Sequence, residues 1–208
     1  MTAAELPLAR IKANGLVLEP LDDDGLRELA PVIRKPTIFE YGFLGGSSVL
    51  PTDDASFVDF MRTALPAYRG GRSFLIREDL GEGEQAPAIG TSSIGNIHRD
   101  REVCEIGWTA YDPSSWGTYV NPACKLALLD HAFEYGFSKV VFNVDEMNQR
   151  SLGAVDKLGA TREGVLRRDR QRPDGTWRNT VTHSILADEW APIRERLVER
   201  LRALGVEA

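Results

Sequence analysis

The sequence predicts a mixed α/β fold. Short runs of β-branched and aromatic residues favour strands, and Val140–Val144 is the clearest of them. Between such runs, apolar residues recur at helical spacing behind capping residues, as Leu26, Leu29 and Ile33 do behind Asp22. In chain order we expect a strand, two helices, three strands, a helix, a strand, a helix, a hairpin and a C-terminal helix, with no repeat and no domain linker.

The composition indicates one soluble domain spanning residues 1–208. Hydrophobic residues make up 42% and charged residues 27%, as in ordinary globular proteins. The net charge of −6 argues against a nucleic-acid partner. Cys104 and Cys124 have no metal-ligand spacing, so we predict no metal site and two free thiols in a reducing cytoplasm. Because neither a secretory signal nor an apolar run of about 18 residues is present, we expect a cytoplasmic protein without membrane contact.

The first half of the chain carries strand and helix patterns in turn, after an N-terminal extension of residues 1–14. Pro20 and Pro36 interrupt the first strand and the first helix. A polar, Gly-rich stretch then suits the tip of a hairpin. The expected elements are a strand at Leu16–Glu19, a helix from Asp22 to Ile33, a helix from Pro51 to Leu65, and paired strands at Ser73–Arg77 and Ile89–His98.

A fourth strand is expected at Val103–Tyr111. Simple alternation places Cys104, Ile106 and Trp108 on one face and Glu105, Gly107 and Thr109 on the other. The loop Asp112–Val120 follows and leads into a helix that Asn121 caps, with Pro122 at its first position. Free N–H groups and the helix dipole at such a junction form an anion site.

The stretch Val140–Ala160 predicts a buried strand, a polar turn and a short helix. Asn148 and Ser151 fall three residues apart at the mouth of that helix, and Gly159 can close it in the left-handed conformation. Strands at Val165–Arg172 and Thr176–Leu186 then meet at a Pro-Asp-Gly turn, and a helix at residues 189–204 follows.

Taken together, the motifs of the second half resemble the GNAT acyl-CoA N-acetyltransferases, and within them the RimJ/RimL-type (ribosomal-protein N-terminal acetyltransferase-like) branch. The resemblance runs in register from Glu105 to Trp190, whereas the first half shares only the order of elements. Its motifs are EIGW at Glu105–Trp108, WGT at Trp116–Thr118, NPxxK at Asn121–Lys125, HAFE at His131–Glu134, NxxS at Asn148–Ser151, LGAxxEG at Leu158–Gly164, the Pro-Asp-Gly hairpin, and SIL with EW at Ser184–Trp190.

The resemblance implies a mixed central sheet of about seven strands with helices on both faces. This sheet splays between the strands that end near Tyr111 and Val144. Acetyl-CoA is the implied acyl donor, and its pantetheine arm lies in the splay. The implied cofactor-binding residues are Trp108, Thr109 and Ala110 for pantetheine; Ser115, Trp116, Gly117, Thr118, Tyr119, Val120 and Asn121 for pyrophosphate; and Asn148 and Ser151 for the pantetheine amides or the thioester.

The resemblance also implies direct transfer of an acetyl group to a primary amine. A backbone N–H at a bulge near Trp108 or Thr109 polarises the carbonyl, and Glu105 removes a proton from the amine through water. Alternatively, Glu105 faces solvent or pairs with Arg99 or Arg101. His98 and Asp145 are the fallback bases.

The chain departs from the family pattern at three positions. Ser114 replaces a Gln or Arg of the pyrophosphate loop, Tyr119 replaces a small residue, and Val155 replaces the Tyr that acts as proton donor in many members. Ser151 is then the best remaining donor to the leaving thiolate, against a plain capping role. A ping-pong route through Cys104 or Cys124 is the weaker alternative.

The acceptor and the partners stay open at this stage. A protein N-terminus, a polyamine, an amino sugar and another small amine are all compatible. The departures leave room for a second class of function, a non-catalytic acyl-CoA sensor or scaffold. A stripe of arginines between Arg162 and Arg178 suits a solvated hairpin, an acidic substrate or RNA. A homodimer through the hairpin or the C-terminal helix is plausible by resemblance.

Overall fold

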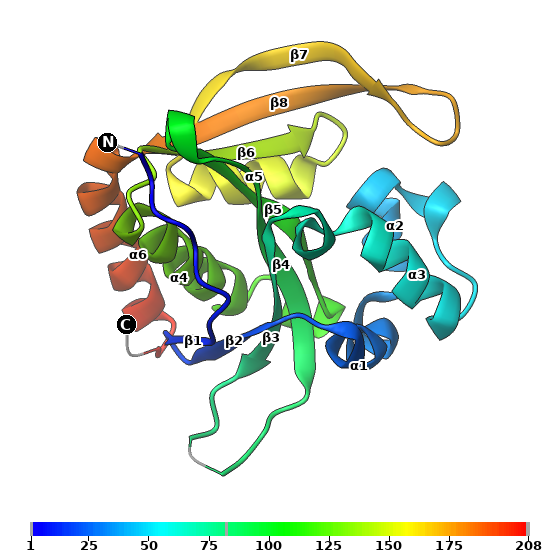
Figure 1. Ribbon diagram of the computed structural model, residues 1–208, viewed down its shortest axis with the longest axis horizontal. Helices are drawn as coiled ribbons and strands as arrows, with labels where there is room; N and C mark the ends of the chain where they lie inside the picture. The colour runs from blue at the N-terminus through cyan, green and yellow to red at the C-terminus, as the bar shows by residue number, and fades with distance from the viewer. Residues whose placement is uncertain (1, 82, 207–208) are drawn as a thin grey trace.

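An eight-stranded sheet organises the chain, in the order β1-β2-β3-β4-β5-β6-β8-β7 (Figure 1). The computed structural model describes residues 2–81 and 83–206. The strands are β1 (Ile11–Ala13), β2 (Leu16–Pro20), β3 (Arg72–Glu78), β4 (Ala88–His98), β5 (Val103–Tyr111), β6 (Lys139–Asp145), β7 (Thr161–Gln171) and β8 (Trp177–Leu186). The mixed α/β prediction is confirmed with one strand more than expected. The additional strand, β1, was not predicted, because its three residues are too few to show an alternating pattern.

Helices cover both faces of the sheet, as the resemblance implied. On one face α4 (Val120–Glu134), α5 (Gln149–Leu158) and α6 (Trp190–Ala203) bury a core with the inner residues of β5 and β6. On the other face α1 (Asp23–Ile33), α2 (Pro36–Glu40) and α3 (Asp54–Ala64) enclose a second core. Figure 1 shows the two groups on opposite sides of the sheet. The sheet opens between β5 and β6, with one group of helices on each side of the opening.

Aspartate side chains cap the first two long helices, which begin one residue (α1) and three residues (α3) after their predicted starts. Asp22 accepts a hydrogen bond from the Gly25 N–H at the start of α1, and Asp53 forms a capping box with Ser56 at the start of α3. The prediction that Asn121 caps its helix is wrong, because α4 already begins at Val120. The Thr118 hydroxyl accepts from the Val120 N–H instead, at 3.3 Å.

The sheet splays between β5 and β6. These strands are parallel and pair only at Val103 with Lys139, Cys104 with Val140, and Glu105 with Val141. Beyond these pairs β5 continues against β4 as far as Tyr111, while β6 continues against β8 as far as Asp145. The two strands therefore diverge, and their facing backbone edges are open to a ligand that adds as a strand would.

A β-bulge in β5 lies at the mouth of this splay. Trp108 and Thr109 together oppose the single residue Ser92, between the Ser93–Gly107 and Thr91–Ala110 pairs. Trp108 has a φ of +50°, a conformation that costs energy for a large L residue. The extra residue breaks the expected alternation: Trp108 packs with the core under α1–α3, and Thr109 turns toward α4. Our assignment of these two side chains to faces was wrong for this reason.

The β7–β8 hairpin projects beyond the sheet toward α2 (Figure 1). Its Pro-Asp-Gly turn forms as predicted, with the Gly175 N–H donating to the Arg172 carbonyl at 2.9 Å. A Cβ placed on Gly45 would lie 3.6 Å from the Pro173 ring, so the hairpin tip rests on the loop that follows α2. Along the described residues, no helix combines the length and apolarity needed to cross a bilayer.

Candidate functional site

The site is centred on the bulge, where a glycine on the neighbouring strand makes room for the Trp108 indole. A Cβ on Gly95 would come within 2.8 Å of that ring, so only glycine fits at this position of β4. The indole thereby occupies the α1–α3 side. The backbone of Trp108, Thr109 and Ala110 runs along the part of β5 that does not pair with β6.

Glu105 lies on β5 three residues before the bulge and is partly buried. Its Oε2 accepts hydrogen bonds from the Asn96 Nδ2 at 2.7 Å and the Asn143 Nδ2 at 2.9 Å. The pairing with Arg99 or Arg101 weighed from the sequence does not occur. A Cβ on Gly107 would lie 3.7 Å from Oε1, so this second oxygen is directed along the strand toward the bulge. One oxygen is thus fixed by two amides, and the other accepts no hydrogen bond from the described residues.

Lys125 is the lysine of the NPxxK motif, but the sequence analysis did not predict it as a site residue. It lies in α4 with only 7% of its surface exposed. Its Nζ donates to the Thr109 hydroxyl at 2.8 Å and the Ser92 hydroxyl at 3.1 Å, directly behind the bulge. Burial lowers the pKa of Lys125 to about 8. A lysine on the apolar stripe of a helix, facing hydroxyl-bearing strands, is the signal that points to such a group.

The loop before α4 has the form of an anion site. Asp112 accepts from the Ser114 N–H at 2.9 Å and forms an ion pair with Lys35, which fixes the first turn. Gly117 follows with a φ of +77° and open space where a side chain would be. Within the described chain, the N–H groups of residues 117, 118, 119 and 121 donate to no protein acceptor. They are available to an anion at the helix N-terminus.

Tyr119 does not obstruct this loop, although it replaces a small residue. Its hydroxyl donates to Glu78 Oε1 at 3.0 Å, and its ring lies against the Gly15 turn between β1 and β2. Burial and the neighbouring Glu78 raise the pKa of Tyr119 to about 12. The side chain is directed toward the β2–β3 side of the sheet, so it leaves the backbone donors of the loop accessible.

Trp116 links the loop to both flanks of the splay. Its Nε1 donates to the Tyr111 carbonyl at 3.1 Å, and Arg150 of α5 stacks 3.5 Å from the centre of its ring. Tyr41 meets the same indole edge-on, with ring centres 5.8 Å apart. The resemblance assigned Trp116 to the pyrophosphate loop and gave no hint of these side-chain contacts. Its partners come from segments far apart in the chain, so no local pattern could have found them.

At the mouth of α5, Asn148 caps the helix by accepting from the Ser151 N–H at 2.9 Å. Both residues lie at the helix mouth as expected, and the cap commits the Asn148 side-chain oxygen to the protein. The Ser151 hydroxyl forms no hydrogen bond with the described residues. Val155, one turn further on, is buried in the core, where it has no proton to give.

The remaining candidates for acid–base or covalent roles are engaged or inert. Asp145 receives two hydrogen bonds from Arg172 Nη2 at 2.8 Å, and His98 ends β4 at an exposed position away from the bulge. Burial raises the pKa of the Cys104 thiol to about 12 and also raises that of Cys124. Neither cysteine is poised as a nucleophile, which favours direct transfer.

Comparison with known proteins agrees with this geometry. Residues 15–161 match the family described as "Acetyltransferase (GNAT) domain". A protein from T. thermophilus, assigned as an acetyltransferase, shares 30% identity at a TM-score of 0.79, covering 92% of this chain and 96% of that one. No curated protein sequence matches the chain.

Two more distant solved structures share the fold and contain coenzyme A or a derivative. RimJ of Mycobacterium smegmatis, in complex with CoA-disulfide, is 20% identical with a TM-score of 0.70, covering 100% of this chain and 99% of that one. The spermidine N-acetyltransferase of Vibrio cholerae, in complex with CoA and spermine, is 16% identical with a TM-score of 0.65, covering 85% and 98%. With the family match spanning most of the sequence, the chain belongs to the GNAT family of acetyltransferases.

Proposed function

We propose that this protein is a cytoplasmic N-acetyltransferase of the RimJ/RimL type, a single domain that acetylates a primary amine. As a GNAT acetyltransferase it uses acetyl-CoA as acyl donor. The position of Glu105 is the main support for an amine as the acceptor, because an amine must lose a proton to a base. Its carboxylate has one oxygen fixed by Asn96 and Asn143 and the other directed toward the bulge.

The residues of the site fit the donor. The backbone edge of Trp108, Thr109 and Ala110 would hold the pantetheine arm as an added strand, and the N–H groups of the loop at Ser115–Asn121 would hold the pyrophosphate. The thioester supplies an activated acetyl group. Ser151, with its free hydroxyl, and the Asn148 side-chain amide lie at the start of α5, beside the end of β6.

In this scheme Glu105 takes the proton of the acceptor amine at Oε1, through a water molecule. A backbone N–H of the bulge, at Trp108 or Thr109, polarises the acyl carbonyl. Lys125 orders that segment from behind through the Thr109 hydroxyl. The Ser151 hydroxyl donates toward the leaving sulfur, since Val155 offers no proton.

The acceptor is a primary amine at a protein N-terminus or on a small molecule. The Vibrio cholerae neighbour is described as a spermidine N-acetyltransferase, and the Mycobacterium smegmatis neighbour as RimJ. Both kinds of amine therefore belong in the first panel. A second class of function, an acyl-CoA sensor without turnover, is favoured by one observation: Val155 is buried where many members have a tyrosine donor.

The test combines calorimetric titration of acetyl-CoA with amine-dependent release of free thiol over a panel of amines and N-terminal peptides. We expect binding, and thiol release that falls by two orders of magnitude or more (about 10²) in Glu105→Gln. Binding should remain, because Glu105 is not assigned to the donor. Glu199→Gln, on the exposed side of α6, is the matched control. Binding without release across the panel would favour the sensor, and no binding would remove the proposal.

A further inference from the structure

One face of β6 and β8 carries a polar network that connects to Glu105. Asn143 is its centre: the side-chain amide donates to Glu105, the side-chain oxygen accepts from the Thr182 hydroxyl at 2.9 Å, and the backbone carbonyl accepts from Arg178 Nη2 at 3.3 Å. Phe142 and Val144 alternate with Asn143 and point into the opposite core. The network therefore lies on the same side of the sheet as Glu105.

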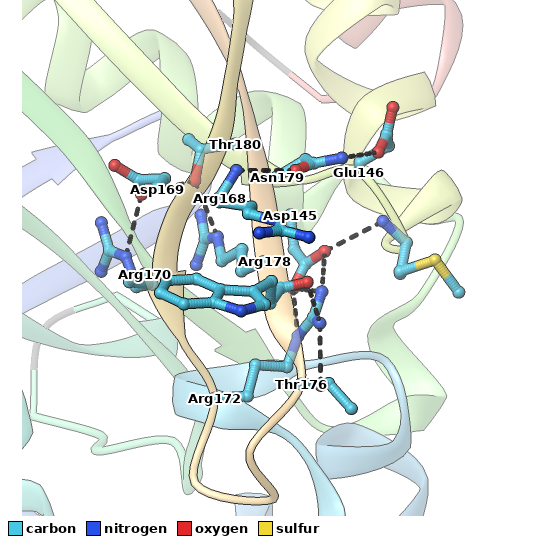
Figure 2. Close-up of polar contacts among 12 residues, drawn as sticks. Asp145, Glu146, Arg168, Asp169, Arg170, Arg172, Thr176, Arg178, Asn179 and Thr180 are labelled. Atoms are coloured by element: carbon cyan, nitrogen blue, oxygen red, sulfur yellow. Dashed lines mark hydrogen bonds and ion pairs between the residues drawn. The ribbon is translucent and has the colours of Figure 1, made fainter.

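Three arginines of the hairpin lie near one another at this face, and two of them have carboxylate partners (Figure 2). Arg172 binds Asp145 through Nη2, with both distances at 2.8 Å, and through Nε at 3.1 Å. Arg170 binds Asp169 at 3.0 Å. Both of these positive charges are thereby compensated by a side chain beside them.

Arg178 differs from its two neighbours. It is partly buried, and its Nε donates to the Thr180 hydroxyl at 2.9 Å while Nη2 donates to the Asn143 carbonyl. Both acceptors are neutral. Among the described residues Arg178 forms no ion pair, and its Nη1 group donates to no protein acceptor.

The charges around Arg178 are occupied elsewhere. Asp145 and Asp169 face it but bind Arg172 and Arg170, and Glu105 binds the two asparagine amides. Burial lowers the pKa of Arg178 and the neighbouring Arg170 lowers it further, although Asp145, Asp169 and Glu105 act in the opposite direction. Such a group is stabilised when an anion binds to its free N–H fork.

We propose that Arg178 binds a carboxylate of the acceptor, so that the substrate is a primary amine that also carries a carboxylate. This inference rests on the proposed function. The acceptor amine lies toward Glu105 and its carboxylate toward Arg178, and the single residue Asn143 spans the two. A free amino acid and a peptide with an acidic N-terminal residue both offer this chemistry.

The experiment compares matched pairs of acceptors that differ only in charge. The pairs are β-alanine and β-alanine amide, glutamate and glutamine amide, and the peptides Asp-Ala-Ala amide and Asn-Ala-Ala amide. For the wild-type protein we expect kcat/KM to be about tenfold higher or more for the carboxylate member. A preference within the first two pairs identifies an amino acid, and one within the third identifies a peptide N-terminus.

Arg178→Gln should bring this ratio close to one, mainly by raising KM for the carboxylate member far more than KM for the neutral member. Arg178→Lys should restore part of the ratio, because a positive charge returns without the planar fork. Arg167→Gln, an exposed position on the same hairpin, removes the same charge and should leave the ratio as in wild type.

The same pairs are titrated calorimetrically in the presence of CoA, so the inference does not depend on turnover. Loss of carboxylate-dependent binding in Arg178→Gln supports it even if transfer is slow. An unchanged charge preference in a folded Arg178→Gln protein, or no preference in the wild type, overturns the inference while the proposed function stands. Binding of acetyl-CoA with no transfer to any amine would instead count against the proposed function.

Discussion

Lys125 shows what a single buried charge does to this protein. Its ammonium lies behind the bulge with two hydroxyls as partners, and burial lowers its pKa to about 8 from 10.5. Between these two values the unfolded chain keeps the proton and the folded chain releases it. Stability therefore rises as the pH increases from about 8 to about 10.5, and the cost of the buried charge is fully present at neutral pH.

We predict that Lys125→Met is more stable than the wild type at pH 7. The shift corresponds to a cost on the order of 3 kcal/mol. The Ser92 and Thr109 hydroxyls already bind one another at 2.8 Å in the wild type, so neither depends on Lys125 alone for a partner. The difference in free energy of unfolding should shrink as the pH rises from 7 to 10, measured by denaturant titration. Lys157→Met, on the exposed side of α5, should show no such pH dependence. This account would be contradicted if Lys125→Met were less stable than the wild type and the difference in free energy of unfolding did not change with pH.

At the scale of the element, β5 depends on a glycine of the strand beside it. Gly95→Ala would place a methyl group 2.8 Å from both the Trp108 ring and Pro66. We expect a loss of about 1–3 kcal/mol in stability from overpacking and a displaced bulge, so kcat should fall more than acetyl-CoA affinity. Thermal unfolding and steady-state kinetics together measure both effects. Equal kcat in a folded variant would show that the bulge does not hold the reacting carbonyl.

The helix α5 offers the opposite case. Gly153 lies inside this helix, and a methyl group added to it would meet no atom within 4 Å, so nothing in the packing requires a glycine there. Gly153→Ala should stabilise the protein by about 0.5–1 kcal/mol, as seen in the midpoint of denaturant unfolding. Destabilisation would contradict the open space found beside Gly153.

Across the whole molecule, an ion network ties α1 to the sheet on the side away from the splay. Arg77, whose side chain is 6% exposed, binds Glu19 at 2.8 Å, both oxygens of Glu28, and the Ala86 carbonyl at 2.9 Å. Only the Arg77 end of this network is buried, because 24% of the Glu19 side chain and 41% of the Glu28 side chain are exposed.

Arg77→Met should lower the free energy of unfolding by about 1–2 kcal/mol, since water can solvate the two carboxylates once the guanidinium is gone. Its affinity for acetyl-CoA in a folded sample should remain at the wild-type value, because β3 does not border the splay. Chemical denaturation and calorimetry provide the two readouts. A parallel loss of affinity would show that the α1–α3 side and the donor site are coupled.

How far the sequence could predict this molecule depended on the range of the interactions. Val140–Val144, the Asp22 cap and the Pro-Asp-Gly turn are local signals, and each element formed where they indicated. Trp108 and Thr109 were assigned to the wrong faces, because a bulge is one extra residue that no period-two pattern contains.

The candidate site was only partly accessible from the sequence for the same reason. Glu105, Asn148 and the loop before α4 lie in recognisable motifs. The asparagines that hold Glu105, the buried contacts of Lys125 and the stacking of Arg150 on Trp116 join segments far apart in the chain. Such partners are set by strand register and packing, so they are visible only in the folded structure.

The arginine stripe on β7 has a consequence for behaviour at high concentration. β7 ends the sheet, nearly all of its residues are exposed, and its outer edge pairs with no described strand. A long, flat strand in that position would template stacking of one molecule on another. Repulsion between like-charged guanidinium groups from Arg162 to Arg170 discourages such growth. We expect that replacing these arginines with valine would increase the tendency of the protein to aggregate into fibres.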